Sequence, residues 1–321
     1  MLPYTLDNNL VYGYNGGLFN HFDKTQPGTL QCSYARATRQ PGTFQEECHN
    51  VARMLVDSAA KLGRTPMILL SGGYDSEVTV RAFLDQGLPF QAVTFRLEHG
   101  LNRHELFYVE KFSKRYNFEV RYVDVDIESW LKTEDAAIKY DVSRCHYAEM
   151  LPHMILMDRI WDDWQGMPVL GNGDLYVTRD INPVWRMNGT GSKYVWNYLE
   201  YEYILAWFRY AVHRNMLGGI GFFQHTPEIT LSMAQEPEMY AVCMDQNPYK
   251  MSSRSTKYVI YKKYWPDLLD RLKYDGGELT KGLYYKFLYE NGNTRMVSYQ
   301  DVWKMPFPEF YNLLQPLWTT D

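Results

Sequence analysis

At 321 residues, with 45% apolar and 22% charged side chains, the chain has the size and composition of a folded globular protein, which excludes disorder as the default reading. Its net charge of −5 differs from the basic balance of proteins that bind a phosphate backbone, so a nucleic-acid partner is not favoured, although a local basic patch stays open. The 4 cysteines are scattered without a C-x-x-C pair, which argues against a disulfide framework and against structural zinc.

Residues 1–43 are rich in glycine, asparagine, threonine and proline and show little periodicity, so we expect an irregular or short-stranded segment there. The chain begins without a basic region followed by an apolar run, and no stretch approaches the roughly 20 apolar residues of a membrane span. We therefore expect a cytoplasmic protein with no membrane partner.

From residue 44 the pattern alternates between helix and strand. Five segments carry apolar residues at helical spacing: 44–62, 75–86, 105–116, 128–140 and 147–164. Four short apolar runs are typical of buried strands: 66–70, 90–96, 118–125 and 168–170. This order predicts an α/β fold over residues 44–185, with a doubly wound, mostly parallel sheet and helices on both faces. In such a sheet, ligands bind beyond the carboxyl ends of the strands.

Strand signals fade after about residue 185. The later segments with a helical pattern are 195–213, 228–233, 256–264 and 266–273. We expect residues 186–321 to form a mainly helical C-terminal portion that packs beside the sheet and completes the active site.

A glycine turn follows the predicted strand 66–70 and consists of Ser71, Gly72, Gly73, Tyr74, Asp75 and Ser76. The two glycines can adopt backbone angles closed to other residues, so successive N–H groups can face one oxyanion, and the next helix adds its positive N-terminus. Ser71 and Ser76 supply hydroxyl donors. Asp75 beside a phosphate requires a cation, and Mg²⁺ prefers carboxylate and phosphate oxygens. The alternative is a strand–turn–helix corner in which Ser71 and Asp75 only cap the helix.

These six residues resemble the S-G-G-x-D-S signature of the PP-loop ATP pyrophosphatases. That superfamily includes asparagine synthetase, GMP and NAD synthetases, and several enzymes that modify tRNA or nucleobases. The resemblance implies a fold of the PP-loop or adenine nucleotide alpha-hydrolase-like type, with ATP and Mg²⁺ as cofactors and release of AMP and pyrophosphate. It also implies that backbone groups at two strand ends lie beside the adenine, namely those of Leu69, Leu70, Thr94 and Phe95.

A second turn, Gly171-Asn172-Gly173-Asp174, follows the predicted strand 168–170. It is similar to the L-S-G-E-G-x-D-E loop of the asparagine synthetase branch, but it is one residue shorter. The resemblance implies that Gly171 lies against the nucleotide and that Asp174 is the second carboxylate on Mg²⁺, beside Asp75. The glutamate that acts as a base in that branch is Asn172 here, and a neutral amide cannot accept the proton. Considered alone, the segment is a turn by composition.

A third match lies in residues 255–260 and 265–269, which are similar to a K-x-x-L-R helix and the leucine-proline stretch after it in the same branch. The resemblance implies that Lys257 neutralises the departing pyrophosphate; the alternative is a solvated surface lysine. The arginine of that motif is replaced by Tyr261. The glutaminase domain of the branch has no counterpart in this chain.

We therefore expect an ATP-dependent, AMP-forming ligase or amidotransferase of the asparagine synthetase-like type, with Lys257, Asp75 and Asp174 in catalytic roles. It would adenylate a small-molecule acceptor and use an amine or ammonia, with a separate glutaminase subunit as one possible source. Two alternatives stay open. One is a superfamily enzyme that modifies tRNA or a nucleobase precursor, and the other is a non-catalytic nucleotide-binding scaffold, which Asn172 in place of the base would suit.

Overall fold

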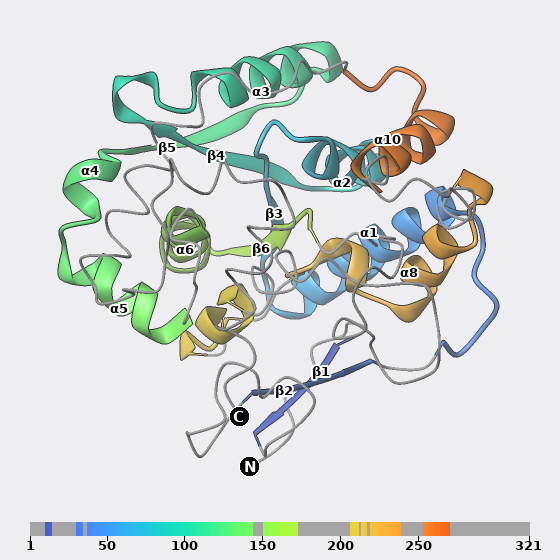
Figure 1. Cartoon of the computed structure of the whole chain (residues 1–321), viewed down its shortest axis with the longest axis horizontal. Coiled ribbons are helices and arrows are strands. Elements are labelled where there is room, and N and C mark those ends of the chain that lie inside the picture. The colour runs from blue at the N-terminus through green and yellow to red at the C-terminus, as the bar shows by residue number, and fades with distance from the viewer. Residues whose placement is uncertain are drawn as a thin grey trace, which may run out of the picture.

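A computed structural model describes residues 10–14, 30–34, 37–143, 150–172, 206–211, 213–216, 219–238 and 253–269 (Figure 1). Its central feature is a parallel sheet of four strands in the order β5-β4-β3-β6. The strands are β3 (Thr65–Leu69), β4 (Gln91–Leu97), β5 (Val120–Val125) and β6 (Gly166–Leu170). The expected α/β fold with a parallel sheet is confirmed.

The strand order creates a switch point between β3 and β6. The chain adds β4 and β5 on one side of β3 and then returns to place β6 on its other side. The strand order therefore reverses between β3 and β6, and open α/β sheets bind ligands at such a point. Both glycine turns singled out in the sequence follow these two strands.

The helices that flank the sheet are α1 (Phe44–Lys61), α2 (Tyr74–Leu84), α3 (Arg103–Tyr116), α4 (Ile127–Trp130), α5 (Glu134–Ser143) and α6 (Leu151–Asp158). A 3₁₀ turn at Glu98–Gly100 precedes α3, and a π-helix, Arg159–Asp163, extends α6. Later in the chain come a 3₁₀ turn at Phe222–Gln224 and helices α8 (Pro227–Ala234) and α10 (Ser253–Tyr264). None of the helices described is long and apolar enough to cross a membrane.

Two apolar clusters bury the two faces of the sheet, because successive strand residues point to opposite sides. Met67 and Leu69 pack with α6 and with residues 206–216. Ile68 and Leu70 pack with α1, α2, α3, α8 and α10 on the other face. Figure 1 shows the same division, with α6 on one side of β3 and β6 and with α1 and α2 on the other. The helix α10 thus joins the face that carries α2.

Local signals explain where several elements begin. Thr43 caps α1, since its hydroxyl accepts from the N–H of Glu46 while the Glu46 carboxylate accepts from the N–H of Thr43. The predicted single helix 128–140 is wrong, because the structure divides it into α4 and α5. Thr133 accounts for the break, as its Oγ1 accepts from the N–H of Ala136 at 3.3 Å and caps α5.

The predicted helix 266–273 is also wrong over its described part, since residues 266–269 form a turn and an irregular segment. Pro266 explains the difference, because it disfavours helical angles at Trp265 and cannot donate a main-chain hydrogen bond. In the N-terminal segment, β1 (Leu10–Tyr14) and β2 (Leu30–Tyr34) pair antiparallel, which fits the expectation of short strands. The domain boundaries at residues 43 and 185 stay predictions.

Candidate functional site

The turn between β3 and α2 is shaped by glycine. Gly72 has φ +76°, a left-handed conformation that side chains with a Cβ rarely adopt. A Cβ at this position would lie 2.5 Å from the main-chain oxygen of Glu105, at the start of α3. Gly73 then takes extended angles as the N-cap of α2 and has no side chain to cover the helix terminus. The N-terminal end of α2 is therefore a site at which an anion can approach the main-chain amides.

Two serines hold this turn together. Ser76 Oγ donates to the carbonyl of Gly73 at 3.0 Å and accepts from the N–H of Ser71 at 3.2 Å. Ser71 Oγ accepts from the N–H of Gly73 at 3.3 Å. Ser76 is buried inside the turn, whereas Ser71 is exposed at its mouth. Of the two predicted hydroxyl donors, Ser71 is the one that a ligand reaches from solvent.

Asp75, in the first turn of α2, is joined to two side chains of α10. Lys257 Nζ donates to Asp75 Oδ2 at 2.8 Å, and Tyr261 Oη donates to Asp75 Oδ1 at 2.8 Å. Lys257 is buried with a side-chain exposure of 7%, while the Asp75 side chain is 26% exposed. A buried ammonium needs a counter-charge, and Asp75 provides it. Two residues predicted to act together therefore meet across 182 sequence positions.

Tyr261 is the residue whose position the sequence analysis missed. Its ring stacks on Phe44 (5.7 Å between centroids, 14° between planes) and on Phe223 (5.9 Å, 20°), and the residue is fully buried. The phenol is thus held rigidly while its hydroxyl reaches Asp75. A signal existed, because positions i and i+4 of a helix share a face, and Tyr261 is four residues after Lys257.

The turn after β6 packs directly on the first turn of α2. A Cβ at Gly171 would lie 2.6 Å from Thr79 Oγ1, 2.9 Å from Ser76 Cα and 3.1 Å from the main-chain oxygen of Asp75. Only glycine fits against these atoms without displacement. Gly171 therefore lies beside the first turns of α2. Asp174, the predicted second metal ligand, lies outside the described residues.

Asn172 contributes an amide with unusual surroundings. Its main-chain oxygen accepts from the N–H of Phe223 at 3.2 Å. Its side-chain Nδ2 and Oδ1 are both shielded from solvent and have no hydrogen-bond partner among the described residues. Unpaired buried amides are costly, so each such group calls for an explanation. An amide that donates and accepts toward a bound molecule would satisfy both atoms.

The four predicted adenine neighbours lie at the carboxyl ends of adjacent strands. Leu69 pairs with Val93 in the β3–β4 register, and the N–H of Leu70 donates to the carbonyl of Val93 at 2.8 Å. One residue further along β4, Thr94 is buried. The main-chain oxygen of Phe95 already accepts from Asn102 Nδ2 at 2.9 Å. The structure brings these predicted residues together at the carboxyl ends of β3 and β4.

Asp75 is the acidic residue that the described part of this site offers to a cation. Within the ranges that the structure describes, no group of three or more histidine, cysteine, aspartate or glutamate side chains is arranged for a metal. A carboxylate beside a turn that an anion can approach suits Mg²⁺, which is typically held by one or two carboxylates together with substrate phosphates and water. The residue fits as one such ligand.

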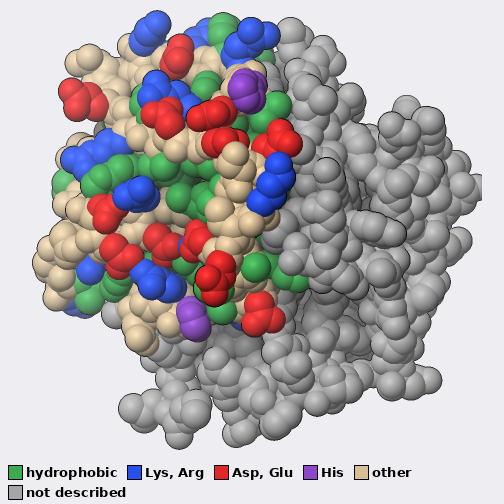
Figure 2. Space-filling view, turned by 90° about the vertical axis from the view of Figure 1, so that its left-hand side faces the viewer, with side chains coloured by type: hydrophobic (Ala, Val, Ile, Leu, Met, Phe, Trp, Pro, Cys, Tyr) green, Lys and Arg blue, Asp and Glu red, His purple; other side chains and the backbone are tan. Residues whose placement is uncertain are grey.

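The side of the molecule that lies on the left in Figure 1 carries both signs of charge. In Figure 2, lysine and arginine side chains alternate with aspartate and glutamate over the described part of this face. Arg96 and Asp124 form an exposed ion pair, with 2.7 Å between Nε and Oδ1. A face of mixed sign does not create the single-sign field with which proteins attract a nucleic-acid backbone.

No family model matches the sequence, and no curated protein matches it. Among solved structures, the chain is similar to the NMN synthetase from Francisella tularensis, with 12% identity, a TM-score of 0.32, and coverage of 80% of this chain and 98% of that one. It is similar to the NH3-dependent NAD synthetase from Campylobacter jejuni, with 14% identity, a TM-score of 0.32, and coverage of 73% and 100%. The glutamine-dependent NAD+ synthetase from Acinetobacter baumannii, in complex with ADP, gives 13% identity and a TM-score of 0.32, with coverage of 75% and 49%. Similarity at this level establishes no shared activity.

Proposed function

We propose that this chain is an ATP-dependent ligase that adenylates a small-molecule acceptor and then joins it to an amine or ammonia. The observation that carries the proposal is the meeting of Lys257 and Asp75 at the N-terminus of α2, beside a glycine turn and at a strand switch point. An anion site, a carboxylate suited to Mg²⁺ and a cationic side chain are the parts that phosphoryl chemistry requires. ATP is the nucleotide that the S-G-G-x-D-S resemblance favours.

Binding would rest on the main chain of residues 71–73 and on the positive end of α2, which together face the phosphates. Asp75 would hold Mg²⁺, which offsets phosphate charge when bound. Gly171 leaves the room that a close approach needs, and Asp174 is proposed as the second carboxylate. The strand ends at Leu70 and Thr94 would lie beside the adenine.

The contact with Asp75 places Lys257 where it could offset the charge of the departing pyrophosphate. Its ammonium sits on a flexible four-carbon stem and contacts Asp75 from α10. It can exchange that carboxylate for the oxygens of a bound triphosphate. In the proposed reaction an acceptor oxygen bonds to the α-phosphorus while the bond to the β-phosphate oxygen breaks. Lys257 would then offset the negative charge that pyrophosphate gains as it leaves, and the amine would displace AMP in a second step.

The test is to identify the products of ATP by chromatography after incubation with Mg²⁺, ammonia and a panel of carboxylate and carbonyl acceptors. The expected products are AMP and pyrophosphate, and release of ADP and phosphate would contradict the proposal. Asp75→Asn and Lys257→Met are each expected to lower the rate by at least about 100-fold. Asp57→Asn, on the exposed side of α1, is the matched control and should leave the rate unchanged.

A second candidate is a nucleotide-binding scaffold without turnover, and Asn172 favours it. The neutral amide stands where the resembled loop carries a base, and it has both hydrogen-bonding functions available to a ligand. This candidate predicts that ATP with Mg²⁺ gives heat in a calorimetric titration while neither AMP nor ADP forms with any acceptor. Modification of tRNA or of a nucleobase precursor is a third candidate, and a gel-shift titration with tRNA over a salt series tests it.

A further inference from the structure

Both carboxylate oxygens of Asp75 are engaged by side chains of α10. Oδ2 accepts from Lys257 Nζ and Oδ1 accepts from Tyr261 Oη, each at 2.8 Å. These oxygens are also the atoms that Asp75 would offer to Mg²⁺, which takes oxygen ligands in proteins. A divalent cation that binds Asp75 therefore has to share the carboxylate with these two donors or displace one of them.

The two donors differ in charge, and so they oppose a cation unequally. A tyrosine hydroxyl that donates a hydrogen bond is neutral, whereas the Lys257 ammonium balances the carboxylate. Mg²⁺ binds oxygen at about 2.1 Å, so a magnesium ion on Oδ2 would lie within roughly 5 Å of Lys257 Nζ. Like charges at this separation repel strongly where water is partly excluded, and the Lys257 side chain is only 7% exposed. Lys257 is therefore the competitor of a metal at Asp75.

Asp75 does not belong to an acidic cluster that would attract a metal against this repulsion. Over the ranges described, no group of three or more histidine, cysteine, aspartate or glutamate side chains could hold a metal ion. A triphosphate at the glycine turn would change the balance, because its oxygens would supply ligands to the cation and a partner to the ammonium at the same time. The metal and the phosphates would therefore favour each other's binding, whereas the metal alone meets a carboxylate whose charge is already balanced.

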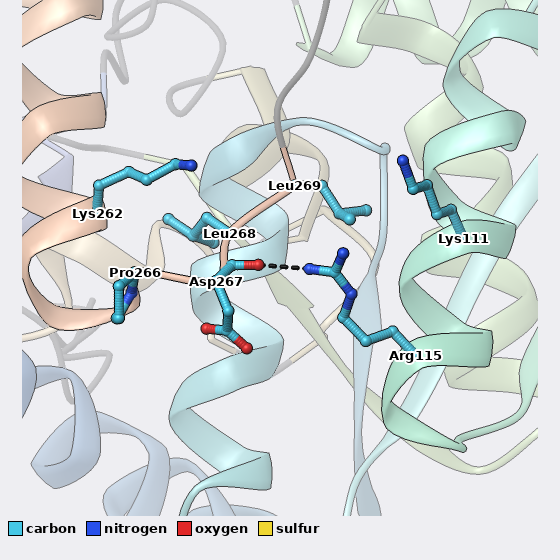
Figure 3. A pocket seen from close by; sticks show the side chains of 7 residues that line it. All are labelled: Lys111, Arg115, Lys262, Pro266, Asp267, Leu268 and Leu269. Carbon is cyan, nitrogen blue, oxygen red and sulfur yellow. Dashed lines mark hydrogen bonds between the residues drawn. The ribbon is translucent and has the colours of Figure 1, made fainter.

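The helix that carries Lys257 is anchored at its other end. Asp267, which follows α10, lies 3.0 Å from Arg81 of α2 (Oδ1 to Nη1), and its main-chain oxygen accepts from Arg115 of α3 (Figure 3). These contacts hold the end of the helix, while the Lys257 ammonium sits on a flexible four-carbon stem. Lys257 can therefore leave Asp75 by rotation of its side chain, with α10 still in place.

We propose that Lys257 keeps free divalent cations off Asp75, so that the metal enters this site together with the phosphates that draw the ammonium away. The inference rests on the proposed function for the metal and the nucleotide, and it makes their binding interdependent. Lys257 would thus control whether the metal position is occupied, in addition to offsetting charge on the leaving pyrophosphate. In the protein without nucleotide, Lys257 is the counter-charge of Asp75 in place of the metal.

The test is a titration of the full chain with Mn²⁺ alone, in which electron paramagnetic resonance measures the metal that remains free. Mn²⁺ suits the same oxygen ligands as Mg²⁺. Lys257→Met removes the charge and keeps a long side chain, so it should bind Mn²⁺ at least about tenfold more tightly than the original chain. Lys257→Gln keeps a donor for Oδ2 and should also gain affinity, which covers the case that the methionine variant folds poorly. Affinity equal to that of the original chain in both variants would overturn the proposal.

Two further variants locate the gain. Asp75→Asn combined with Lys257→Met lacks the carboxylate and should lose the added affinity for Mn²⁺, and a gain that persists would place the metal elsewhere and overturn the proposal. Lys111→Met is the control for charge, because it removes an ammonium of α3 that lies 5.8 Å from the centroid of the Phe107 ring, beside the cavity of Figure 3. It should bind Mn²⁺ as the original chain does. A gain equal to that of Lys257→Met would reduce the effect to net charge and would also overturn the proposal.

The Mn²⁺ titration requires no turnover, so its result is independent of the products formed from ATP. Tighter Mn²⁺ binding by Lys257→Met, for a chain that releases no AMP, would support the competition at Asp75 and contradict the proposed ligase. Release of AMP and pyrophosphate without any gain in Mn²⁺ affinity would support the ligase and overturn this inference.

Discussion

Lys257 Nζ lies 2.8 Å from Asp75 Oδ2, and the two residues are 182 positions apart in the sequence. This contact holds α10 against the first turn of α2, directly after the glycine turn of residues 71–73. It also means that each residue is the other's counter-charge in the ligand-free protein. The consequences for stability and for nucleotide binding can be separated by mutation.

The pair itself should be energetically coupled. Lys257→Met leaves a partly buried carboxylate, and Asp75→Asn leaves a buried ammonium, so each is expected to lower the free energy of unfolding by about 1–3 kcal/mol. The double variant should cost less than the two single costs combined, because it leaves neither charge unpaired. Urea unfolding at neutral pH measures all three. Simple additivity of the two losses would show that the contact contributes nothing.

The variant Tyr261→Phe should separate the contribution of the Tyr261 hydroxyl from that of its stacked ring. The stacked ring stays between Phe44 and Phe223, so the loss in the free energy of unfolding should be only about 0.5–1.5 kcal/mol. Asp75 loses one of its restraints, and ATP binding in the presence of Mg²⁺ should weaken by roughly two- to fivefold.

The control for Tyr261→Phe is Tyr264→Phe on the same helix. Its hydroxyl bonds to Glu236 rather than to Asp75. This variant should lose similar stability without a change in ATP affinity, as measured by calorimetry. Equal effects of the two variants on ATP would contradict a positioning role for Tyr261.

Gly171→Ala should damage the proposed nucleotide site through packing. The new methyl group would press on Thr79 and on the main chain of Ser76, and it would push α2 away from the loop after β6. We expect a loss of about 1–3 kcal/mol in the free energy of unfolding and a tenfold or greater loss, roughly, in ATP affinity.

Gly87→Ala is the control for this substitution. Gly87 has φ +60°, and no atom lies within 4 Å of the added methyl group. Its strain of about 1–2 kcal/mol should lower stability and leave ATP binding unchanged. Unchanged ATP affinity in Gly171→Ala would show that this loop does not approach the nucleotide.

His225 should make stability depend on pH. Burial lowers the pKa of His225 to about 4, from an ordinary value of 6.5, because the imidazolium loses its hydration. Between these two values the unfolded chain binds a proton that the folded chain does not. The neutral, buried His225 therefore contributes roughly 2–4 kcal/mol to the free energy of unfolding. This contribution is complete above pH 6.5 and falls as the pH drops toward 4.

The measurement is a series of urea unfolding curves from pH 4 to pH 7.5. His225→Leu should flatten the slope in this window, and it should be tolerated because neither ring nitrogen has a hydrogen-bond partner in the described part of the chain. His213→Gln, at an exposed position, should keep the slope. The same slope in His225→Leu would assign the effect to other groups.

Local sequence patterns predicted the parallel sheet. They predicted the assembly of the candidate site only in part. The alternation of helical and strand spacing predicted the parallel sheet, and the glycine turns marked its two neighbouring strand ends. Thr133, followed by two acidic residues, carried a helix-start signal that the broad helical pattern of 128–140 obscured. Pro266 likewise marked the end of α10 more reliably than the apolar residues after it.

What lay beyond local reasoning was the register of α10 on α2. Whether Lys257 faces Asp75 or solvent depends on how the Tyr261 ring packs on Phe44 and Phe223, and these three residues come from distant segments. The spacing of Lys257 and Tyr261 places them on one face of α10, but it does not say which residues that face contacts. The unpaired amide of Asn172 is a similar case, since its burial depends on the close approach of residue 223.

The distance in sequence between α2 and α10 has a consequence during synthesis. A nascent chain in which α10 still lies inside the ribosome has made the glycine turn and Asp75, but it lacks the ammonium that balances this carboxylate and the tyrosine ring that covers α1. Any early encounter with a nucleotide would therefore meet an open half-site. The proposed phosphate site would be complete only once α10 has emerged and docked.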